Sequence, residues 1–347
     1  MSRRSILLKS LVKIIDDYRA GEIDNITPDL ISKWLTQFSK SNQDRILEEL
    51  IFTISKTYIS KALFREFLKV LAKSKKIASG SKISGYWRKA NFLDIQTTSN
   101  SQKEILLLFN EVLHDTYGFY LEDTGSEEGD YIYIDDCMGT GTRIKNDICT
   151  WLNNDSPKEI NLHIITPIMY TGSWWIDDHI KTTAENNGKI INMHKWRLPD
   201  YEMENRREKR NISDVLWPSE IPNDQYVLKY KDYLDRSKYS PILRKPGNPG
   251  VSRIYKNDEA KKLLEAEFLI RGCQIRDECT SLPEKARPLG FQNLICFGFG
   301  SMFITYRNCP NNCPLVFWVE QNDYPSLFPR KTNNPINYLT FKKGFLD

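Results

Sequence analysis

Apolar residues recur every three to four positions through the first 75 residues, with polar residues between them. This period is that of a helix with one buried face. Thr27 before Pro28 is typical of a helix start, because threonine caps the first turn and proline suits the first helical position. Ser60 precedes another such stripe. The pattern predicts three or four short amphipathic helices, which must bury their stripes on each other, on the rest of the chain or on a partner.

A break rich in Lys, Ser and Gly follows at residues 73–85 and suggests a boundary. Beyond it, apolar runs of strand length alternate with stripes of helical period. The predicted strands cover residues 91–95, 131–134, 162–166 and 189–193, and the predicted helices cover 102–114, 143–153 and 174–185. This alternation favours a parallel α/β sheet with right-handed crossovers, in which ligands bind beyond the carboxyl ends of the strands.

The chain is less regular after residue 195. Residues 258–272 favour a helix, whereas 294–306 and 314–319 favour two strands around the Asn311-Asn312 turn. Residues 206–210, Arg-Arg-Glu-Lys-Arg, form a charge cluster. A solvated helix face is the favoured interpretation of this cluster, and direct nucleic-acid contact is the alternative.

Composition places the chain among ordinary globular proteins, with 347 residues, 40% hydrophobic and 27% charged. A net charge of +4 is not typical of a dedicated nucleic-acid-binding protein. The sequence has no apolar run of eighteen residues, so we expect no membrane span, and the lysine-interrupted start predicts no signal peptide. Seven cysteines, an odd number, favour reduced thiols in the cytoplasm. Because the cysteines lack Cys-x-x-Cys spacing, we predict no structural zinc; a four-cysteine zinc site is the less favoured alternative.

Candidate chemistry is concentrated directly after the predicted strand 131–134. The strand ends in the carboxylates of Asp135 and Asp136, and a Gly/Thr-rich loop, residues 139–143, leads into a helix. Amides at a helix N-terminus suit a phosphate monoester, and two carboxylates suit the hydroxyls of a ribose or a hydrated Mg²⁺. The pattern therefore favours a sugar-phosphate site over the alternative, an ordinary strand-turn-helix with a solvated aspartate pair.

Other residues are weaker candidates. The loop 96–101 opens a helix, and Ser99, Ser101, Gln102 and Lys103 offer groups that suit a second anion; a plain capped helix is the alternative. Arg330 is either a guanidinium that reaches the site or a surface arginine. Packing of Trp174 and Trp175 on a helix face is favoured over stacking on a base. His163 alternates with core positions of a strand, so a packed imidazole is favoured over a catalytic base.

The segment 131–143 resembles the diphosphate-ribose (PRPP) motif of type I phosphoribosyltransferases, which consists of a strand, two acidic residues and a Thr/Gly loop. The resemblance implies that Asp135 and Asp136 face the ribose 2′- and 3′-hydroxyls, with Mg²⁺ held there directly or indirectly. It further implies a cradle for the 5′-phosphate, made by Thr140, Gly141, Thr142 and the amide of Arg143. Gly139 stands where some purine-salvage members carry an aspartate that touches the base.

The chain also resembles the PRTase-CE family, the phosphoribosyltransferase-like proteins of bacterial conflict systems. The resemblance is carried by four segments: Trp34…Gln37-Phe38, Phe92–Gln96 with Ser101-Gln102, Asn308–Trp318 and Pro325–Arg330. It covers roughly residues 30–331. It implies a type I phosphoribosyltransferase-like α/β fold, a parallel sheet with helices on both faces, an N-terminal helical extension and a C-terminal β-rich cap. The corresponding domains are 1–75, 86–331 and a tail at 332–347.

The function implied by this resemblance is that of an antiphage effector, of a retron or a related system. It would act at ribose C1 of a diphosphate-ribose donor or a nucleotide, beside a partner such as an ATPase or a reverse transcriptase with its non-coding RNA. Two alternatives stay open: a non-catalytic nucleotide or PRPP sensor, and a nucleic-acid-binding component of the same kind of complex. The residues do not identify the acceptor.

Overall fold

The computed structural model describes residues 2–97, 101–206, 212–237, 241–245, 253–321 and 324–330. The chain forms two compact units. One unit is residues Ser60–Glu202, and the other combines Met1–Ile59 with Met203–Asp347. The middle of the sequence is thus a continuous unit, inserted into a unit built from both ends of the chain. The expected ranges 1–75 and 86–331 do not coincide with these units, and the expected tail at 332–347 lies outside the described residues.

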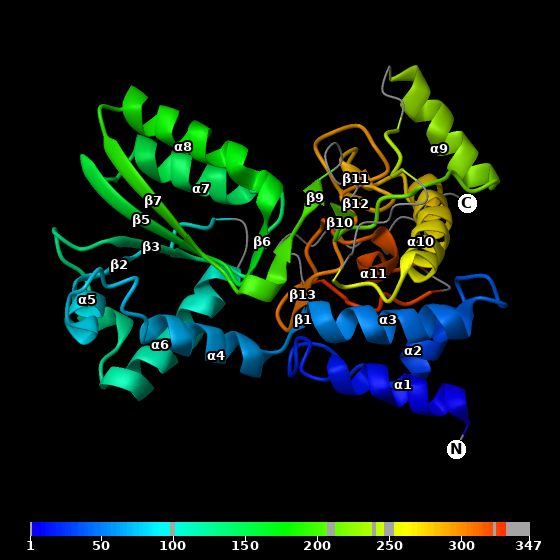
Figure 1. The fold of residues 1–347 in the computed structure, drawn as a ribbon, viewed down its shortest axis with the longest axis horizontal. Coiled ribbons are helices and arrows are strands. Elements are labelled where there is room, and N and C mark those ends of the chain that lie inside the picture. Colours follow the sequence, from blue (N-terminus) through cyan, green and yellow to red (C-terminus); the bar gives the residue numbers. More distant parts are fainter. Residues whose placement is uncertain are drawn as a thin grey trace, which may run out of the picture. The chain divides into compact units, whose positions relative to one another are not determined.

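The unit Ser60–Glu202 is mixed α/β (Figure 1). Its helices are α4 (Lys61–Ala72), α5 (Ile83–Lys89), α6 (Ser101–Tyr117), α7 (Thr142–Asn153) and α8 (Trp175–Asn186), with 3-10 turns η1 (Leu121–Asp123), η2 (Thr171–Trp174) and η3 (Pro199–Tyr201). Its strands are β2 (Asn91–Phe92), β3 (Tyr131–Ile134), β4 (Cys137–Met138), β5 (Glu159–Ile165), β6 (Ile168–Tyr170), β7 (Ile190–Trp196) and β8 (Glu202–Met203), whose last residue already belongs to the other unit.

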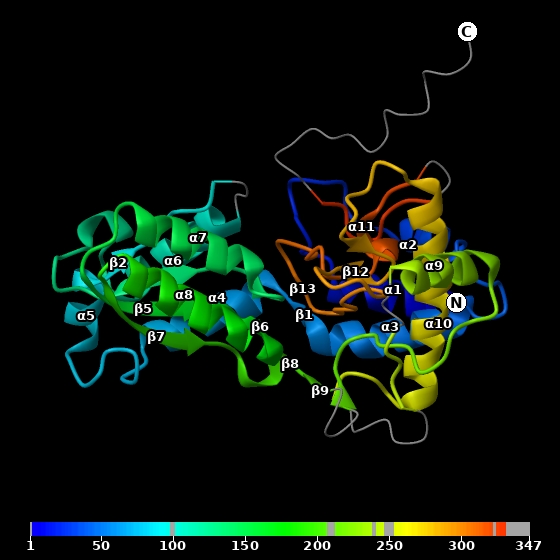
Figure 2. The ribbon, with the colours of Figure 1, turned by 90° about the horizontal axis from the view of Figure 1, so that it is seen from above.

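The main sheet has the order β2-β3-β5-β7, and all of its strand pairs are parallel. Helices α7 and α8 cover one face, where Ile148, Leu152 and Ile180 pack on Leu162 and other apolar residues of the sheet. Helix α6 lies on the opposite face, with α4 packed against it (Figures 1 and 2). A parallel sheet with helices on both faces is therefore confirmed.

A second small sheet, ordered β4-β6-β8, was not predicted. Its strands have two or three residues each, and Cys137 and Met138 of β4 pair in parallel with Ile168 and Met169 of β6. Strands this short leave no periodic pattern in the sequence. Strands β4 and β6 come directly after β3 and β5 in the chain, so their pairing holds together the segments that follow the carboxyl edge of the main sheet.

The unit formed by the chain ends is largely helical. Its helices are α1 (Arg3–Ile14), α2 (Pro28–Leu35), α3 (Gln43–Thr57), α9 (Gln225–Arg236), α10 (Asp258–Glu278) and α11 (Leu315–Trp318). Its strands are the two-residue segments β1 (Tyr58–Ile59), β9 (Asn205–Arg206), β10 (Ile212–Ser213), β11 (Ala286–Arg287), β12 (Gly290–Phe291) and β13 (Ile304–Thr305).

The N-terminal stripes are buried within this unit. The indole N–H of Trp34 donates to the carbonyl of Val316 at 2.7 Å, and its ring stacks on Phe317 at 6.1 Å. Arg19 donates to the carbonyl of Arg307 at 3.0 Å, although 288 positions separate the two residues. The N-terminal helices thus share a core with the C-terminal part of the same unit. Burial on the rest of the chain was one of the destinations that the sequence predicted for their apolar stripes.

The expected C-terminal β-rich cap is not observed in the described residues. The predicted strand 314–319 is the short helix α11, which follows Pro314, and only Ile304–Thr305 of the predicted strand 294–306 is a strand. Burial explains the error at 314–319. Leu315, Val316 and Phe317 are all buried, so an unbroken apolar run fitted a strand as well as a buried helical turn.

Candidate functional site

The acid pair lies at the carboxyl end of β3, where the main sheet ends. Asp135 and Asp136 are both buried, and the amide of Asp135 continues the sheet by donating to the carbonyl of Ile165 at 3.0 Å. The strand-loop-helix predicted from the sequence is present, with β3 at Tyr131–Ile134 and α7 beginning at Thr142. The acid pair and the loop therefore lie at the sheet edge where ligands of parallel α/β sheets bind.

The loop after the acid pair reaches α7 through Gly141, which has a φ of +77°. A Cβ on Gly141 would lie 2.7 Å from Cγ2 of Ile176 on α8, so glycine is needed both for its backbone conformation and for space. Gly141 is the N-cap residue of α7 and has no side chain to cap the helix. The first N–H groups of a helix have no partner within that helix, so this end of α7 carries a partial positive charge that suits an anion.

Asp135 is held by a network that sequence reasoning missed. Gln96 Nε2 donates to Asp135 Oδ2 at 2.6 Å and to Tyr133 Oη at 3.0 Å. Ser101 Oγ donates to Asp135 Oδ1 at 3.0 Å, and the amide of Asp136 donates to the same oxygen at 2.9 Å. Three segments of the chain thus meet at this one carboxylate, which orients the acid pair relative to the loop 96–101.

The network continues to Asp147 on α7, because Tyr133 Oη donates to Asp147 Oδ2 at 2.9 Å. Burial raises the pKa of Asp147 to about 6, although the hydrogen bond from Tyr133 and the charge of Arg143 oppose the shift. Burial likewise raises the pKa of Asp135, against the hydrogen bonds from the Asp136 amide and Ser101 and the charge of Arg143. Asp147 lies four residues after Arg143, on the same side of α7, and this spacing was the only sequence signal for it.

The residues assigned to a second anion site fall in three different places. Ser101 contacts Asp135, as described above. Gln102 is fully buried, and its Oε1 accepts hydrogen bonds from the amides of Ile95 and Gln96 at 2.8 and 3.0 Å. Its side chain therefore positions the segment that follows β2. Lys103 is exposed and lines a separate cavity beside β2. Ser99 lies outside the described residues.

Arg330 belongs to the other compact unit, where its guanidinium lies 5.0 Å from the centre of the Trp318 ring. The charge cluster 206–210 lies outside the described residues, apart from the backbone of Arg206 in β9.

The aromatic candidates Trp174, Trp175 and His163 differ in how far their side chains are packed. Trp175 packs against the core between the sheet and α7, as predicted, but the side chain of Trp174 is 65% exposed, so its predicted packing is wrong. The 3-10 turn η2 ends at Trp174, and helix α8 starts one residue later than predicted, which turns this side chain outward. His163 is a packed imidazole, as predicted: Nδ1 accepts the Trp196 indole N–H at 2.8 Å, and Nε2 lies 3.0 Å from Asp130.

The donor set of the acid pair fits Mg²⁺, which prefers carboxylate oxygens and water. The two carboxylates are adjacent and buried at the same sheet edge. Burial raises the pKa of Asp135 because it disfavours the charged form, and a cation at this edge would lower that pKa again. Asp135 and Asp136 are therefore the residues that would hold the ion. Among the described residues, no group of three or more His, Cys, Asp or Glu side chains is arranged to hold a metal.

A parallel sheet, an acid pair at its carboxyl edge and a glycine-turned loop opening a helix define the class of phosphoribosyltransferase-like α/β domains. The chain belongs to the PRTase-CE family, whose family model matches residues 31–330. None of the curated proteins or solved structures matches it. Within the described ranges, no helix has both the length and the apolarity to cross a membrane.

Proposed function

We propose that the chain is a phosphoribosyltransferase-like effector of a bacterial antiphage system, of the retron type or a related conflict system. The observation that carries the proposal is the buried Asp135-Asp136 pair at the end of β3, followed by the Gly141 turn at the start of α7. Membership of the PRTase-CE family supports the reaction class. The substrate is a ribose 5-phosphate carrying a leaving group at C1, either diphosphate or a base.

In this proposal the chain's own groups bind and position the ribose. The amides at the start of α7 and the hydroxyls of Thr140 and Thr142, which lie 3.1 Å apart, hold the 5′-phosphate. The carboxylates of the acid pair face the ribose hydroxyls and stabilise the positive charge that develops at C1 when its bond breaks. Mg²⁺, when bound, would neutralise the charge of a diphosphate leaving group.

The remaining parts of the proposal come from the family's association with conflict systems. The partner would be an ATPase or a reverse transcriptase with its non-coding RNA, in the cytoplasm. The first alternative is a sensor that binds PRPP or a nucleotide without turnover. The second is a nucleic-acid-binding component that uses residues 206–210, for which salt-dependent binding lost on neutralising these residues would be the evidence.

Calorimetric titration with ribose 5-phosphate, and with PRPP and Mg²⁺, tests the site. We expect binding by the wild type and at least a tenfold weaker affinity for the double variant Asp135→Asn, Asp136→Asn, which loses about 1.4 kcal/mol or more of binding free energy. Asp178→Asn, on the exposed side of α8, is the matched control and should bind normally. Equal affinity of the folded double variant would refute the ribose-site assignment.

Pyrophosphate release then separates the enzyme from the sensor. Release by the wild type with PRPP and Mg²⁺, absent from the double variant, supports an enzyme, whereas binding without release supports a sensor. Metabolite profiles of cells that express the wild type or the double variant would identify the acceptor.

A further inference from the structure

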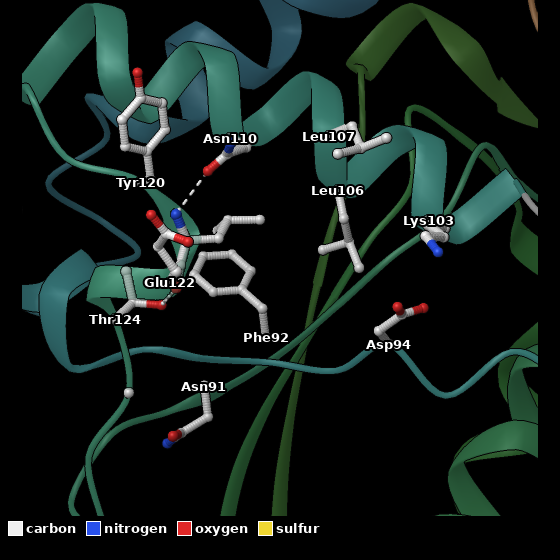
Figure 3. A pocket seen from close by; sticks show the side chains of 12 residues that line it. Asn91, Phe92, Asp94, Lys103, Leu106, Leu107, Asn110, Tyr120, Glu122 and Thr124 are labelled. Carbon is white, nitrogen blue, oxygen red and sulfur yellow. Dashed lines mark hydrogen bonds between the residues drawn. The ribbon is translucent and has the colours of Figure 1, made fainter.

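A cavity of about 620 Å³ lies beside the edge of the main sheet (Figure 3). Asn91, Phe92 and Asp94 of β2 and the residues after it line one side. Helix α6 lines a second side with Lys103, Leu106, Leu107 and Asn110. The segment Tyr120–Gly125 closes the third. We call this cavity the β2 groove. Neither the acid pair nor the loop 139–143 contributes to its lining.

The strand that borders the β2 groove is an edge strand with unused peptide groups. Strand β2 is terminal in the order β2-β3-β5-β7. The amides of Asn91 and Leu93 donate to the carbonyls of Asp130 and Ile132 at 2.8 and 2.9 Å. Because successive peptide groups of a strand point to opposite sides, those of Phe92 and Asp94 point away from β3, toward the groove. Such an edge can pair with another extended chain.

The side chains of the β2 groove combine an apolar strip with an acidic rim. Leu107 is 57% exposed and lines the groove together with the half-buried Phe92. Asn110 Oδ1 accepts the amide of Leu121 at 2.6 Å, which fixes the third wall against α6 (Figure 3). Two carboxylates, Asp94 and Glu122, and one cation, Lys103, line the groove. Because the carboxylates outnumber the cation, the lining favours a ligand with net positive charge.

We propose that the β2 groove binds an extended, basic segment of a partner protein, which adds to the sheet as a new strand beside β2. Peptide groups of the segment pair with those of Phe92 and Asp94. An apolar side chain covers Leu107, and flanking Lys or Arg residues face Asp94 and Glu122. A cavity of this volume also suits a small molecule, but a strand edge and an exposed leucine are the features that a peptide would use. This inference does not depend on the ribose-phosphate chemistry.

Binding of a peptide pool to the full chain tests the proposal. The probes are fluorescent, end-capped heptapeptides in which Lys or Arg alternates with Val, Ile, Leu or Phe. We expect members of this pool to bind, and matched peptides with Glu in place of Lys and Arg not to bind. Alternate backbone nitrogens of the best peptide, those on the strand edge that faces β2, are then methylated. This change should lower the affinity of the peptide at least tenfold, because methylation removes the N–H donors of the new strand pairing.

Amide-resolved hydrogen exchange distinguishes strand pairing from binding in a side-chain pocket, because only strand pairing protects the backbone amides of β2 and the residues after it. Bound peptide should slow exchange at Phe92 and Asp94, and leave Asn91 and Leu93 unchanged because β3 already protects them. Leu107→Arg should weaken binding at least tenfold, since it places a cation on the apolar strip. Ile190→Arg is the matched control, because Ile190 is 71% exposed on β7, the opposite edge strand of the same sheet.

Three results would overturn the proposal. The first is that no member of the pool binds at about 1 mM, where even a weak peptide ligand is detectable. The second is binding that backbone methylation does not change, which would indicate a small-molecule or side-chain pocket. The third is equal loss of binding in Leu107→Arg and Ile190→Arg.

Discussion

Replacing Gly141 by alanine should destabilise the unit Ser60–Glu202 for two separable reasons. The left-handed conformation, with a φ of +77°, costs an alanine about 1–2 kcal/mol. In addition, the new Cβ would lie 2.7 Å from Cγ2 of Ile176 and 3.4 Å from Cβ of Ser173. The Ile176 atom is a branch at Cβ rather than a flexible end, and overpacking of this kind costs about 1–3 kcal/mol. The expected total is therefore about 2–5 kcal/mol of unfolding free energy.

Gly188→Ala is the matched control for the conformational part. Gly188 has a φ of +65°, and a Cβ there would meet no atom within 4 Å, so only the cost of about 1–2 kcal/mol applies. Urea denaturation at equilibrium, compared at equal slopes, measures both losses. Measured in the background of Ile176→Ala, the substitution Gly141→Ala should cost less unfolding free energy than in the wild type, since the closest atom is already gone. The same comparison should show weaker ribose 5-phosphate binding for Gly141→Ala only.

Equal losses of stability for Gly141→Ala and Gly188→Ala would refute the close approach of the loop to α8. A difference that persists unchanged when Ile176 is also truncated would place the clash elsewhere.

Three further predictions concern the rest of the chain. Because burial raises the pKa of Asp147 from 3.8 to about 6, the folded state binds that proton more tightly, so the unfolding free energy should fall as the pH rises through this window; Asp147→Asn should lack this contribution in unfolding curves measured across the same range. Trp34→Ala should cost about 3–5 kcal/mol in a denaturant titration, whereas Trp174→Ala, at an exposed position, should stay within about 0.5 kcal/mol; similar costs would contradict the burial of the N-terminal helices. Elemental analysis of the purified protein should find no stoichiometric zinc, and one zinc per chain would contradict the interpretation of the cysteines.

Local signals in the sequence predicted the elements that depend on local chemistry. Thr27 caps α2 by accepting the amide of Leu30 at 3.2 Å, and Ser60 caps α4 by accepting that of Leu63 at 3.1 Å. Gly188 follows α8 with a φ of +65°, in the position after a helix where glycine is common. Strand β3 has the predicted bounds, because an apolar run followed by two aspartates and a glycine-rich loop permits few other arrangements.

Features that depend on distant partners could not be predicted in this way. The pairing of β1 with β13 joins Tyr58 to Ile304, and nothing near either residue specifies the other. The bond from Gln96 to Asp135 depends on how the loop 96–101 meets the end of β3. The exposure of Trp174 likewise depends on a single 3-10 turn before α8. The strand-loop-helix that carries the candidate site could thus be predicted from the sequence, but not the hydrogen bonds that hold its side chains.

The discontinuous unit has a consequence for synthesis on the ribosome. Residues 60–202 are consecutive, so their unit can fold as soon as they have emerged. Helices α1 to α3 instead need Phe317 and its neighbours to complete their core. At about 5–20 residues per second, Phe317 is made roughly 13–50 s after the end of α3. During that interval α1, α2 and α3 can pack on one another, but the apolar residues that face the C-terminal part of the unit have no native partner. The nascent chain is therefore expected to depend on chaperones that shield exposed apolar segments until the last part of the chain is complete.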